Sequence, residues 1–292
     1  MVKTLFNFLR GVLIGIAEVI PGVSGGTIAL ITGIYNRLLN NADLVFRSVL
    51  KIATPSVIVK TFIKLEWKLL IPVFIGMFIA LILGARFIEP LLETNPIELR
   101  SIFAGLVLAG IYIPYKMSLA ATYKKWGIRD YLLALISAIA AFALTGLPPG
   151  EISNPSSSII FFSAAVAICA LVLPGISGSF LLLTIGMYST TISAVNERNF
   201  QYLFIFALGA LVGLGSFVSF LKWLLKEKAR PTLVVLAGLM LGSLRALWPW
   251  QTENRDLLAP YSLEIVSALL FGVGIIVVWG LIQIENRIGE RE

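Results

Sequence analysis

A six-residue Pro-Gly phrase that occurs twice, deep within apolar sequence, constrains this chain more than any other feature. The first copy, PGVSGG, spans residues 21–26, the second, PGISGS, spans 174–179, and a Gly-X-Tyr tripeptide begins seven residues after each copy. Proline removes a backbone donor and glycine loosens the backbone, so each phrase is expected to break a helix. In a bilayer, a broken backbone survives only where protein or a watery cavity covers it. Paired breaks in two halves of a chain are typical of a midplane site in a transporter.

The composition indicates a membrane setting. Hydrophobic residues make up 58% of the 292 residues, charged residues only 13%, and the mean hydropathy is +0.92. Apolar runs near the length that crosses a bilayer core of about 30 Å recur along the chain. The segments between them are short, and the apolar N-terminal stretch has no small-residue cleavage site before the first phrase. We therefore expect a polytopic membrane protein that keeps its N-terminal segment.

Several chemistries lack their usual residues. The chain has no His and one Cys, Cys169, which excludes internal disulfides and a metal site built from His or Cys. Its three Asp residues, Asp43, Asp130 and Asp256, all fall in predicted loops. An Asp-rich magnesium site of the kind that membrane phosphotransferases use therefore has little to build on. We expect no cofactor and no enzymatic activity.

Six spanning helices are predicted, and two broken segments lie apart from them. The broken segments cover residues 5–39 and 158–195. Each could cross the membrane once as an interrupted helix, cross it twice, or enter and return as a re-entrant hairpin. Their limbs are short for full crossings and the phrase carries no charge, so re-entrant hairpins are favoured. The spans are predicted at 68–88, 99–116, 131–147, 202–221, 232–248 and 262–283.

Charge distribution supports a chain that folds back at both broken segments. If each segment returns to its own side, 18 of the 23 Lys and Arg residues lie on one face, which the positive-inside rule makes cytoplasmic. If either segment crossed the membrane only once, the Lys and Arg residues would be spread over both faces. Both termini are then expected in the cytoplasm. The five cations of the opposite face are Arg86, Arg100, Arg198, Arg245 and Arg255.

The internal repeat extends beyond the two phrases. Gly76 aligns with Gly209 and Gly105 with Gly238, both at an offset of 133 residues. Each half then consists of a re-entrant helical hairpin and three transmembrane helices, with the first half at 1–150 and the second at 151–292. Because three crossings are an odd number, the second half enters from the opposite side and the repeat is inverted. The expected fold is an all-α polytopic membrane protein of two inverted repeats whose hairpin tips meet near the midplane.

The segment 43–67 has a different pattern. Its apolar residues alternate at helical spacing with Lys60 and Lys64, and Trp67 follows. This pattern indicates a basic amphipathic helix lying on a leaflet of anionic lipid. An ordinary cytoplasmic loop is the alternative.

The restart of the helix after each break is a candidate anion site. A helix N-terminus presents unpaired N–H groups and the positive end of its dipole, which suit a phosphate or carboxylate. Glycine allows close approach of the ligand to the backbone, and the hydroxyl groups add donors. Tight packing of small residues between helices is the alternative. The residues expected to break the helices are Pro21, Gly22, Pro174 and Gly175, and those expected to bind phosphate are Ser24, Gly25, Gly26, Thr27, Ser177, Gly178 and Ser179.

Three charged residues near the predicted spans have two interpretations each. Glu18 lies in apolar sequence three residues before the first phrase, and its counterpart is Leu171. It could carry a proton during transport or could bond to the freed backbone of its own hairpin. Arg86 and Arg245 end predicted spans, where they could snorkel to the lipid headgroups or steer an anionic headgroup inward.

At these residues the chain resembles the PopT family. The resemblance lies in the run from Gly15 to Tyr35, which contains EVIPGVSGGT, and in its echo LVLPGISGS at 171–179. Members were formerly catalogued as a membrane domain of unknown function and are associated with undecaprenyl-phosphate translocation. The resemblance implies a flippase that returns the phosphate of a lipid carrier from the outer to the inner leaflet for cell-envelope synthesis. Dependence on membrane potential or protons is also implied. The second phrase departs from the first at Ser179 and Phe180.

The function expected from these patterns is transport of polyprenyl phosphate across the plasma or inner membrane, with anionic membrane lipids as partners and no nucleic acid. The main alternative is a secondary transporter of a small anionic solute, which would need a closed route from water to water. An intramembrane enzyme acting on lipid phosphates is a third class. Tail length, direction, coupling ion and oligomeric state are left open by the sequence.

Overall fold

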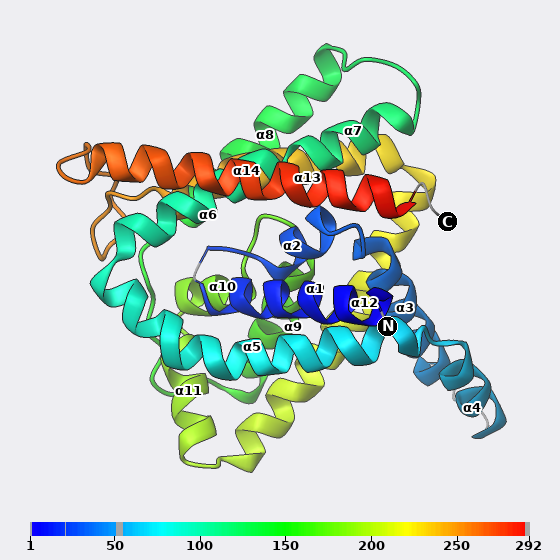
Figure 1. Ribbon diagram of the computed structural model, residues 1–292. Helices are drawn as coiled ribbons and strands as arrows, with labels where there is room; N and C mark the ends of the chain where they lie inside the picture. Colours follow the sequence, from blue (N-terminus) through cyan, green and yellow to red (C-terminus); the bar gives the residue numbers. More distant parts are fainter. Residues whose placement is uncertain (1, 21, 51–54, 290–292) are drawn as a thin grey trace.

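A computed structural model describes residues 2–20, 22–50 and 55–289 of the chain. The described residues form helices and loops with no strand, apart from one isolated bridge between Gln251 and Leu257 (Figure 1). The helices are α1 (Val2–Val19), α2 (Gly25–Ile31), α3 (Tyr35–Leu50), α4 (Pro55–Lys64), α5 (Trp67–Thr94), α6 (Pro96–Gly110), α7 (Tyr112–Ala120), α8 (Ile128–Thr145), α9 (Ser157–Val172), α10 (Gly178–Ile185), α11 (Tyr188–Asn196), α12 (Phe200–Glu227), α13 (Ala229–Ser243), η1 (Leu244–Leu247) and α14 (Glu264–Gly289).

Among the described residues, six segments are long and apolar enough to cross a membrane. They are α5, α6 with α7, α8, α12, α13 with η1, and α14. Each coincides with one predicted span; α5, α6 with α7, and α12 extend beyond both predicted ends, and the other three are shifted by up to three residues. A seventh candidate is α10 with α11, which bend by 103° at the break between them. The expected polytopic all-α protein is therefore confirmed, with span boundaries that differ from the predicted ones by up to six residues.

The first broken segment folds back on itself, as its charge pattern predicted. Asn7 on α1 donates to the carbonyl oxygen of Lys68 (3.0 Å), and Arg37 on α3 is paired with Glu66, directly before α5. The start of α1, which enters the hairpin, and the start of α3, which leaves it, thus lie at the same end of α5. The returning helix α2 has 7 residues, about 10 Å, which is too short to cross a bilayer.

The second broken segment also returns to the end from which it came. Helix α10 has 8 residues, about 12 Å. At its far end the amide of Ile152 donates to the carbonyl oxygen of Gly186 (2.9 Å), and the hydroxyl of Thr190 donates to that of Ile152 (2.6 Å). The segment that leads into α9 therefore lies beside the segment that leaves α10.

Each hairpin packs its first helix along the first long span of its own half. A side chain at Gly76 on α5 would collide with the backbone of Phe8 on α1, and one at Gly209 on α12 would collide with the backbone of Phe161 on α9. Phe8 and Phe161 are 153 residues apart, the same offset as between the two phrases. The two halves therefore use aligned positions for the same close helix contact.

The remaining spans pack across the two halves. Gly105 on α6 lies against the backbone of Phe271 on α14, and Gly238 on α13 lies against that of Ala134 on α8. The second span of each half thus packs on the third span of the other half. The glycines are the pair that the sequence aligned, so this exchange is reciprocal.

Ion pairs gather at the end of the bundle where both chain ends lie (Figure 1). Arg10 on α1 pairs with Glu285 on α14. Asp43 on α3, 2% exposed, accepts from Lys222 on α12 (2.8 Å) and from Arg47 (2.7 Å). Both groups join an element of the first half to one of the second half.

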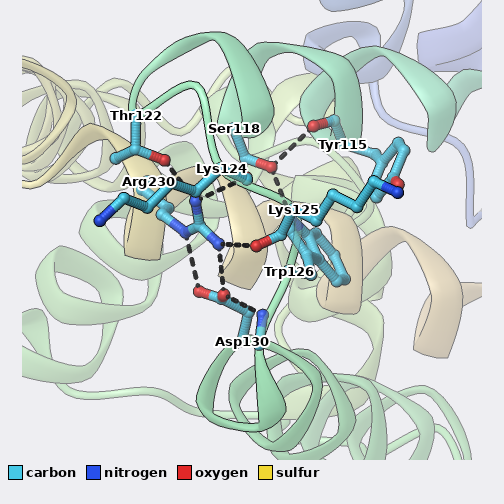
Figure 2. A network of polar contacts seen from close by, with 9 residues as sticks. Tyr115, Ser118, Thr122, Lys124, Lys125, Trp126, Asp130 and Arg230 are labelled. Atoms are coloured by element: carbon cyan, nitrogen blue, oxygen red, sulfur yellow. Dashed lines mark hydrogen bonds and ion pairs between the residues drawn. The ribbon is translucent and has the colours of Figure 1, made fainter.

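Figure 2 shows a third group at this end, around Arg230 at the start of α13. Its guanidinium donates to both carboxylate oxygens of Asp130 on α8 (2.6 and 3.2 Å) and to the carbonyl oxygens of Lys124 and Lys125 (2.9 and 2.8 Å). Trp126 donates to the Ser118 hydroxyl (2.7 Å), which closes the same loop onto α7. The loop between α7 and α8 is thereby held against α13.

The structure corrects two expectations. Asp43 and Asp130 do not lie in loops: Asp43 is within α3 and Asp130 is in the first turn of α8. The stretch 43–67 is not one helix, because α3 continues to Leu50 and α4 covers only Pro55–Lys64. Residues 51–54 and Pro21, one of the expected helix breakers, lie outside the described part of the chain.

Candidate functional site

The two helix breaks meet inside the bundle and are joined by hydrogen bonds. The Ser24 hydroxyl donates to the carbonyl oxygens of Leu171 and Leu173 (3.3 and 3.0 Å). The amide of Gly175 donates to the Thr27 hydroxyl (2.9 Å). Sequence reasoning placed the tips together, and the structure brings these predicted residues into direct contact.

Both breaks use the same backbone geometry. Gly22 and Gly175, one in each phrase, have φ of +91°, in the left-handed region that favours glycine. Gly22 lies against Ala246 of η1, and Gly175 lies against the backbone of Met240 on α13. Both breaks are therefore covered by protein, as a broken backbone inside a bilayer requires.

Each of the first three amides of α2 has an acceptor. Ser24 is its N-cap and accepts from the Gly26 amide (3.1 Å). The Gly25 amide donates to Glu18 Oε1 (2.8 Å), and the Thr27 amide donates to the Ser24 carbonyl oxygen (2.9 Å). The carboxylate of Glu18 thus sits where an anionic ligand of this helix end would sit, and it bonds to the freed backbone of its own hairpin.

The N-terminus of α10 is different. Ser177 is its N-cap, as predicted, and accepts from the Phe180 amide (3.4 Å). The hydroxyls of Ser177 and Ser179 lie 2.9 Å apart. Within the described part of the chain, the amides of Gly178 and Ser179 have no acceptor: Leu171 stands where the first hairpin has Glu18, and the Ser177 hydroxyl accepts from Phe180 and not from Ser179. This helix end therefore presents two free donors beside a hydroxyl pair.

An apolar cavity of about 580 Å³ begins at the first break. Its lining includes Glu18, Gly25 and Gly26 at the break, and Tyr35 and Asn41 on α3. Phe74 and Val45 in its wall are 54% and 37% exposed, so the cavity is open at the surface of the bundle. The walls come from α1, α3, α5 and α12 and include Ile14, Leu38, Val45, Val73, Phe74, Met77, Leu81, Leu214 and Val218.

The two arginines singled out from the sequence have different surroundings. Arg86 is exposed on α5, and its guanidinium lies 5.9 Å from the ring of the adjacent Phe87. Arg245 instead turns inward, with its guanidinium 4.7 Å from the ring of Phe142 on α8. Only Arg245 is held against other elements of the bundle.

Two contributors to this region were missed from the sequence. The Tyr35 hydroxyl donates to the carbonyl oxygen of Val172 (3.1 Å) and so adds a further bond between the hairpins. Arg255 reaches from the loop before α14 to Thr184 on α10 (3.0 Å). The repeated Gly-X-Tyr tripeptide was a signal for Tyr35, whereas nothing in the sequence distinguished Arg255 from the other arginines of its face.

Comparison with known proteins identifies relatives over nearly the whole chain. The family model described as VCA0040-like, undecaprenyl phosphate translocase-like, matches residues 14–265. A polyprenyl-phosphate transporter of Vibrio cholerae is 41% identical over 247 residues, which cover 85% of this chain and 78% of the relative. One of Staphylococcus aureus is 31% identical over 297 aligned residues, covering 96% and 98% of the two chains. Both relatives are named as transporters and not as enzymes. No solved structure matches. The chain therefore belongs to the VCA0040-like, undecaprenyl phosphate translocase-like family of membrane transporters.

Proposed function

We propose that this protein moves a polyprenyl phosphate, undecaprenyl phosphate in particular, from the outer to the inner leaflet of the plasma or inner membrane. The lipid carrier would then be reused in cell-envelope synthesis. The observation that carries the proposal is the junction of two helix breaks beside a cavity whose lining is mostly apolar. Such a site suits a ligand that has one charged group and a hydrocarbon tail.

The phosphate is proposed to bind at the helix restarts. The candidate donors are the seven residues of the sequence prediction, and the second hairpin supports the proposal better than the first in this conformation. Its free Gly178 and Ser179 amides and the Ser177–Ser179 hydroxyl pair can donate to phosphate oxygens. At the first hairpin, Glu18 holds the Gly25 amide, so a ligand there would have to displace this carboxylate.

The prenyl chain is proposed to occupy the apolar cavity. Its walls offer little beyond hydrocarbon surface, and its opening at the surface would let most of the tail remain in lipid. This arrangement favours a lipid over a small anionic solute, the rival substrate, because a solute route needs polar walls from one aqueous side to the other. It also needs no catalytic group, in keeping with the names of the relatives.

Alternating access from the two sides is proposed to follow from two inverted repeats at 1–150 and 151–292. The equivalent packing of α1 on α5 and of α9 on α12, and the reciprocal packing of α6 on α14 and α13 on α8, support this relation. The proposed orientation places both termini in the cytoplasm. Helix α4 would then lie on the inner leaflet, where its exposed Lys60 and Lys64 would meet anionic lipid and exposed Phe62 would enter the apolar layer.

The test is transport by the purified protein in vesicles that contain a fluorescent polyprenyl phosphate, followed by quenching from outside. Ser179→Ala removes a half-buried hydroxyl whose partner is Ser177. Because a hydrogen bond to a charged group contributes about 1.5–3 kcal/mol, we expect the apparent affinity for the lipid to fall by about 10-fold or more. Entrapped inorganic phosphate in the same vesicles tests the rival substrate.

Ser216→Ala is the matched control, because Ser216 is exposed on α12 and bonds to carbonyl oxygens of its own helix. This control should transport at the wild-type rate. Equal lipid affinity in Ser179→Ala and wild type, at equal melting temperature, would remove the second hairpin from the site. Efflux of inorganic phosphate without lipid movement would replace the proposed function by its rival.

A further inference from the structure

Two arginines converge on the C-terminal end of α8, at the end of the bundle opposite the chain termini. Arg245 lies in η1, and its guanidinium rests on Gly146, where a side chain would collide with it. It donates to the carbonyl oxygen of Phe142 (3.4 Å). Arg255 comes from the loop before α14 and donates to the carbonyl oxygen of Leu147 (2.7 Å). The two side chains thus reach the same helix end from different elements.

A compact turn directs Arg255 inward. The amide of Thr252 donates to the carbonyl oxygen of Asp256 (3.0 Å), and the bridge between Gln251 and Leu257 closes the turn behind it. Arg255 itself has φ of +68°, a left-handed conformation that is unfavourable for a residue with a side chain. Its guanidinium lies 3.8 Å from the ring centre of Phe180, in the first turn of α10. The turn therefore places a cation against the second hairpin.

Neither arginine has an acidic partner among the described residues. Arg255 is 8% exposed, and its side chain bonds to one carbonyl oxygen and to the Thr184 hydroxyl. Burial lowers the pKa of Arg255, although a guanidinium stays protonated in proteins. The Nε atom of Arg245 is buried without any hydrogen-bond partner. At the other end of the bundle, by contrast, arginines pair with carboxylates: Arg10, Arg37, Arg47 and Arg230.

Arg255 is buried and Arg245 is half-buried, and a cation removed from water without a counter-ion is unfavourable. The lost hydration is recovered only where an opposite charge or hydrogen bonds replace it. The C-terminal end of α8 supplies only about half an elementary negative charge, shared between two guanidiniums. The remaining positive charge favours an anion from outside the described chain.

From this geometry we propose that Arg245 and Arg255 form a binding site for a phosphate monoester. A monoester carries close to two negative charges at neutral pH, which match two guanidiniums, and each guanidinium can donate two parallel hydrogen bonds to its oxygens. The source is a lipid headgroup or free phosphate. For the lipid, the inference rests on the proposed function and makes this pair an outer docking site, distinct from the helix restarts.

The position suits delivery of a phosphate to the breaks. Ala246, the residue after Arg245, lies against Gly22 of the first break. Arg255 contacts α10 through Phe180 and Thr184. A headgroup held by both arginines would therefore lie next to both hairpins.

The experiment measures binding of three probes to the purified protein in lipid nanodiscs: polyprenyl phosphate, the uncharged polyprenol of the same length, and inorganic phosphate. We expect Arg245→Gln and Arg255→Gln each to lower the affinity for polyprenyl phosphate at least 10-fold and to leave polyprenol binding unchanged. Arg198→Gln is the matched control, because Arg198 is an exposed cation that the sequence assigns to the same face, and it should bind like wild type. Inorganic phosphate that binds as tightly as the lipid, and with the same loss in both variants, would identify free phosphate as the source.

Melting temperatures and the variants Arg245→Lys and Arg255→Lys separate binding from a structural role. Lysine keeps the positive charge at the end of α8 but loses the bidentate geometry, so it should restore stability and recover phosphate binding only in part. Unchanged phosphate affinity in folded Gln variants would overturn the proposal and leave both arginines as caps of α8. The proposal would also be overturned if the Gln variants lost stability and phosphate binding together and the Lys variants regained both fully. Wild-type binding without lipid movement would instead contradict the proposed function and leave this site standing.

Discussion

Glu18 and Leu171 occupy equivalent positions before the two breaks, 153 residues apart, and they give the two helix restarts different properties. The carboxylate of Glu18 accepts from the Gly25 amide, whereas Leu171 can accept nothing with its side chain. One hairpin therefore carries its own anion and the other leaves its donors free. This difference makes Glu18 the residue whose charge state most directly affects the first break.

Replacing Glu18 by Gln tests whether this residue carries a proton during transport. The amide oxygen of Gln can still accept from Gly25, so we expect an unchanged melting temperature and unchanged lipid binding. If Glu18 carries the proton, transport into vesicles should no longer respond to an imposed pH gradient, because Gln cannot be protonated. The measurement is the initial rate of lipid movement with and without the gradient.

Glu253→Gln, an exposed change in the loop before α14, is the control and should keep the response. A Glu18→Gln protein whose transport still follows the pH gradient would leave only the hydrogen bond to Gly25 as the role of this residue.

For single residues, the sequence predicted the helix N-caps but did not predict hydrogen-bond partners that are distant in the chain. Ser24 and Ser177 could be placed because a serine after a helix break is a local signal. The acceptors of the Ser24 hydroxyl lie 147 and 149 residues away, so no local pattern could identify them. Arg255 was missed for the same reason, since its burial depends on a turn whose direction is set by tertiary packing.

Among the elements, the long apolar helices were predictable and α3 was not. Hydropathy identifies a span because every residue in it must suit lipid or a packed interior. Helix α3 is polar on one side and carries Asp43, which was therefore assigned to a loop. The structure places that carboxylate against α12, where Lys222 and Ser219 satisfy it, so tertiary contacts decide the element.

The link between α3 and α12 makes stability depend on pH. Burial alone would raise the pKa of Asp43, but hydrogen bonds from Lys222, Arg47 and Ser219 outweigh it and hold the pKa below its usual range. The unfolded chain then takes up a proton at a higher pH than the folded chain. The link therefore stabilises the protein above the ordinary Asp pKa of about 3.9, and the stabilisation is lost as the pH falls from there through the lower folded value.

Asp43→Asn should lower the free energy of unfolding at pH 7 by about 2 kcal/mol, because it weakens hydrogen bonds to two charged groups. The difference from wild type should shrink as the pH is lowered below 4, where wild-type Asp43 also becomes neutral. Thermal melting in detergent across this range is the measurement. A difference that stays constant with pH would show that the Asp43 charge does not stabilise the fold.

For the molecule as a whole, the number of spans and the return of both broken segments followed from hydropathy and charge. The exchange of partners between the halves did not, because hydropathy does not specify which helix a lipid-facing segment packs against. Glycines carried that information in part: Gly105 and Gly238 were aligned from the sequence, yet their partners Phe271 and Ala134 became visible only in the structure.

Cysteine labelling tests the proposed orientation of the bundle. In a Cys169→Ala background, single cysteines at Asn95, Asn154 and Asn254 should react with an impermeant thiol reagent added to intact cells. Cysteines at Thr61 and Lys124 should react only after the membrane is opened. Labelling of Thr61 from outside would contradict both the returning first hairpin and the inverted relation of the halves.

The hydrogen bonds between the two breaks have a mechanical consequence. A motion that parted the hairpins would leave the hydroxyls of Ser24, Thr27 and Tyr35 without partners in apolar surroundings, at about 1–3 kcal/mol for each unsatisfied group. The two hairpins should therefore move as one rigid unit. The helix pairs around them would then supply the motion, and the close backbone contacts at their glycines are the surfaces along which these helices would slide.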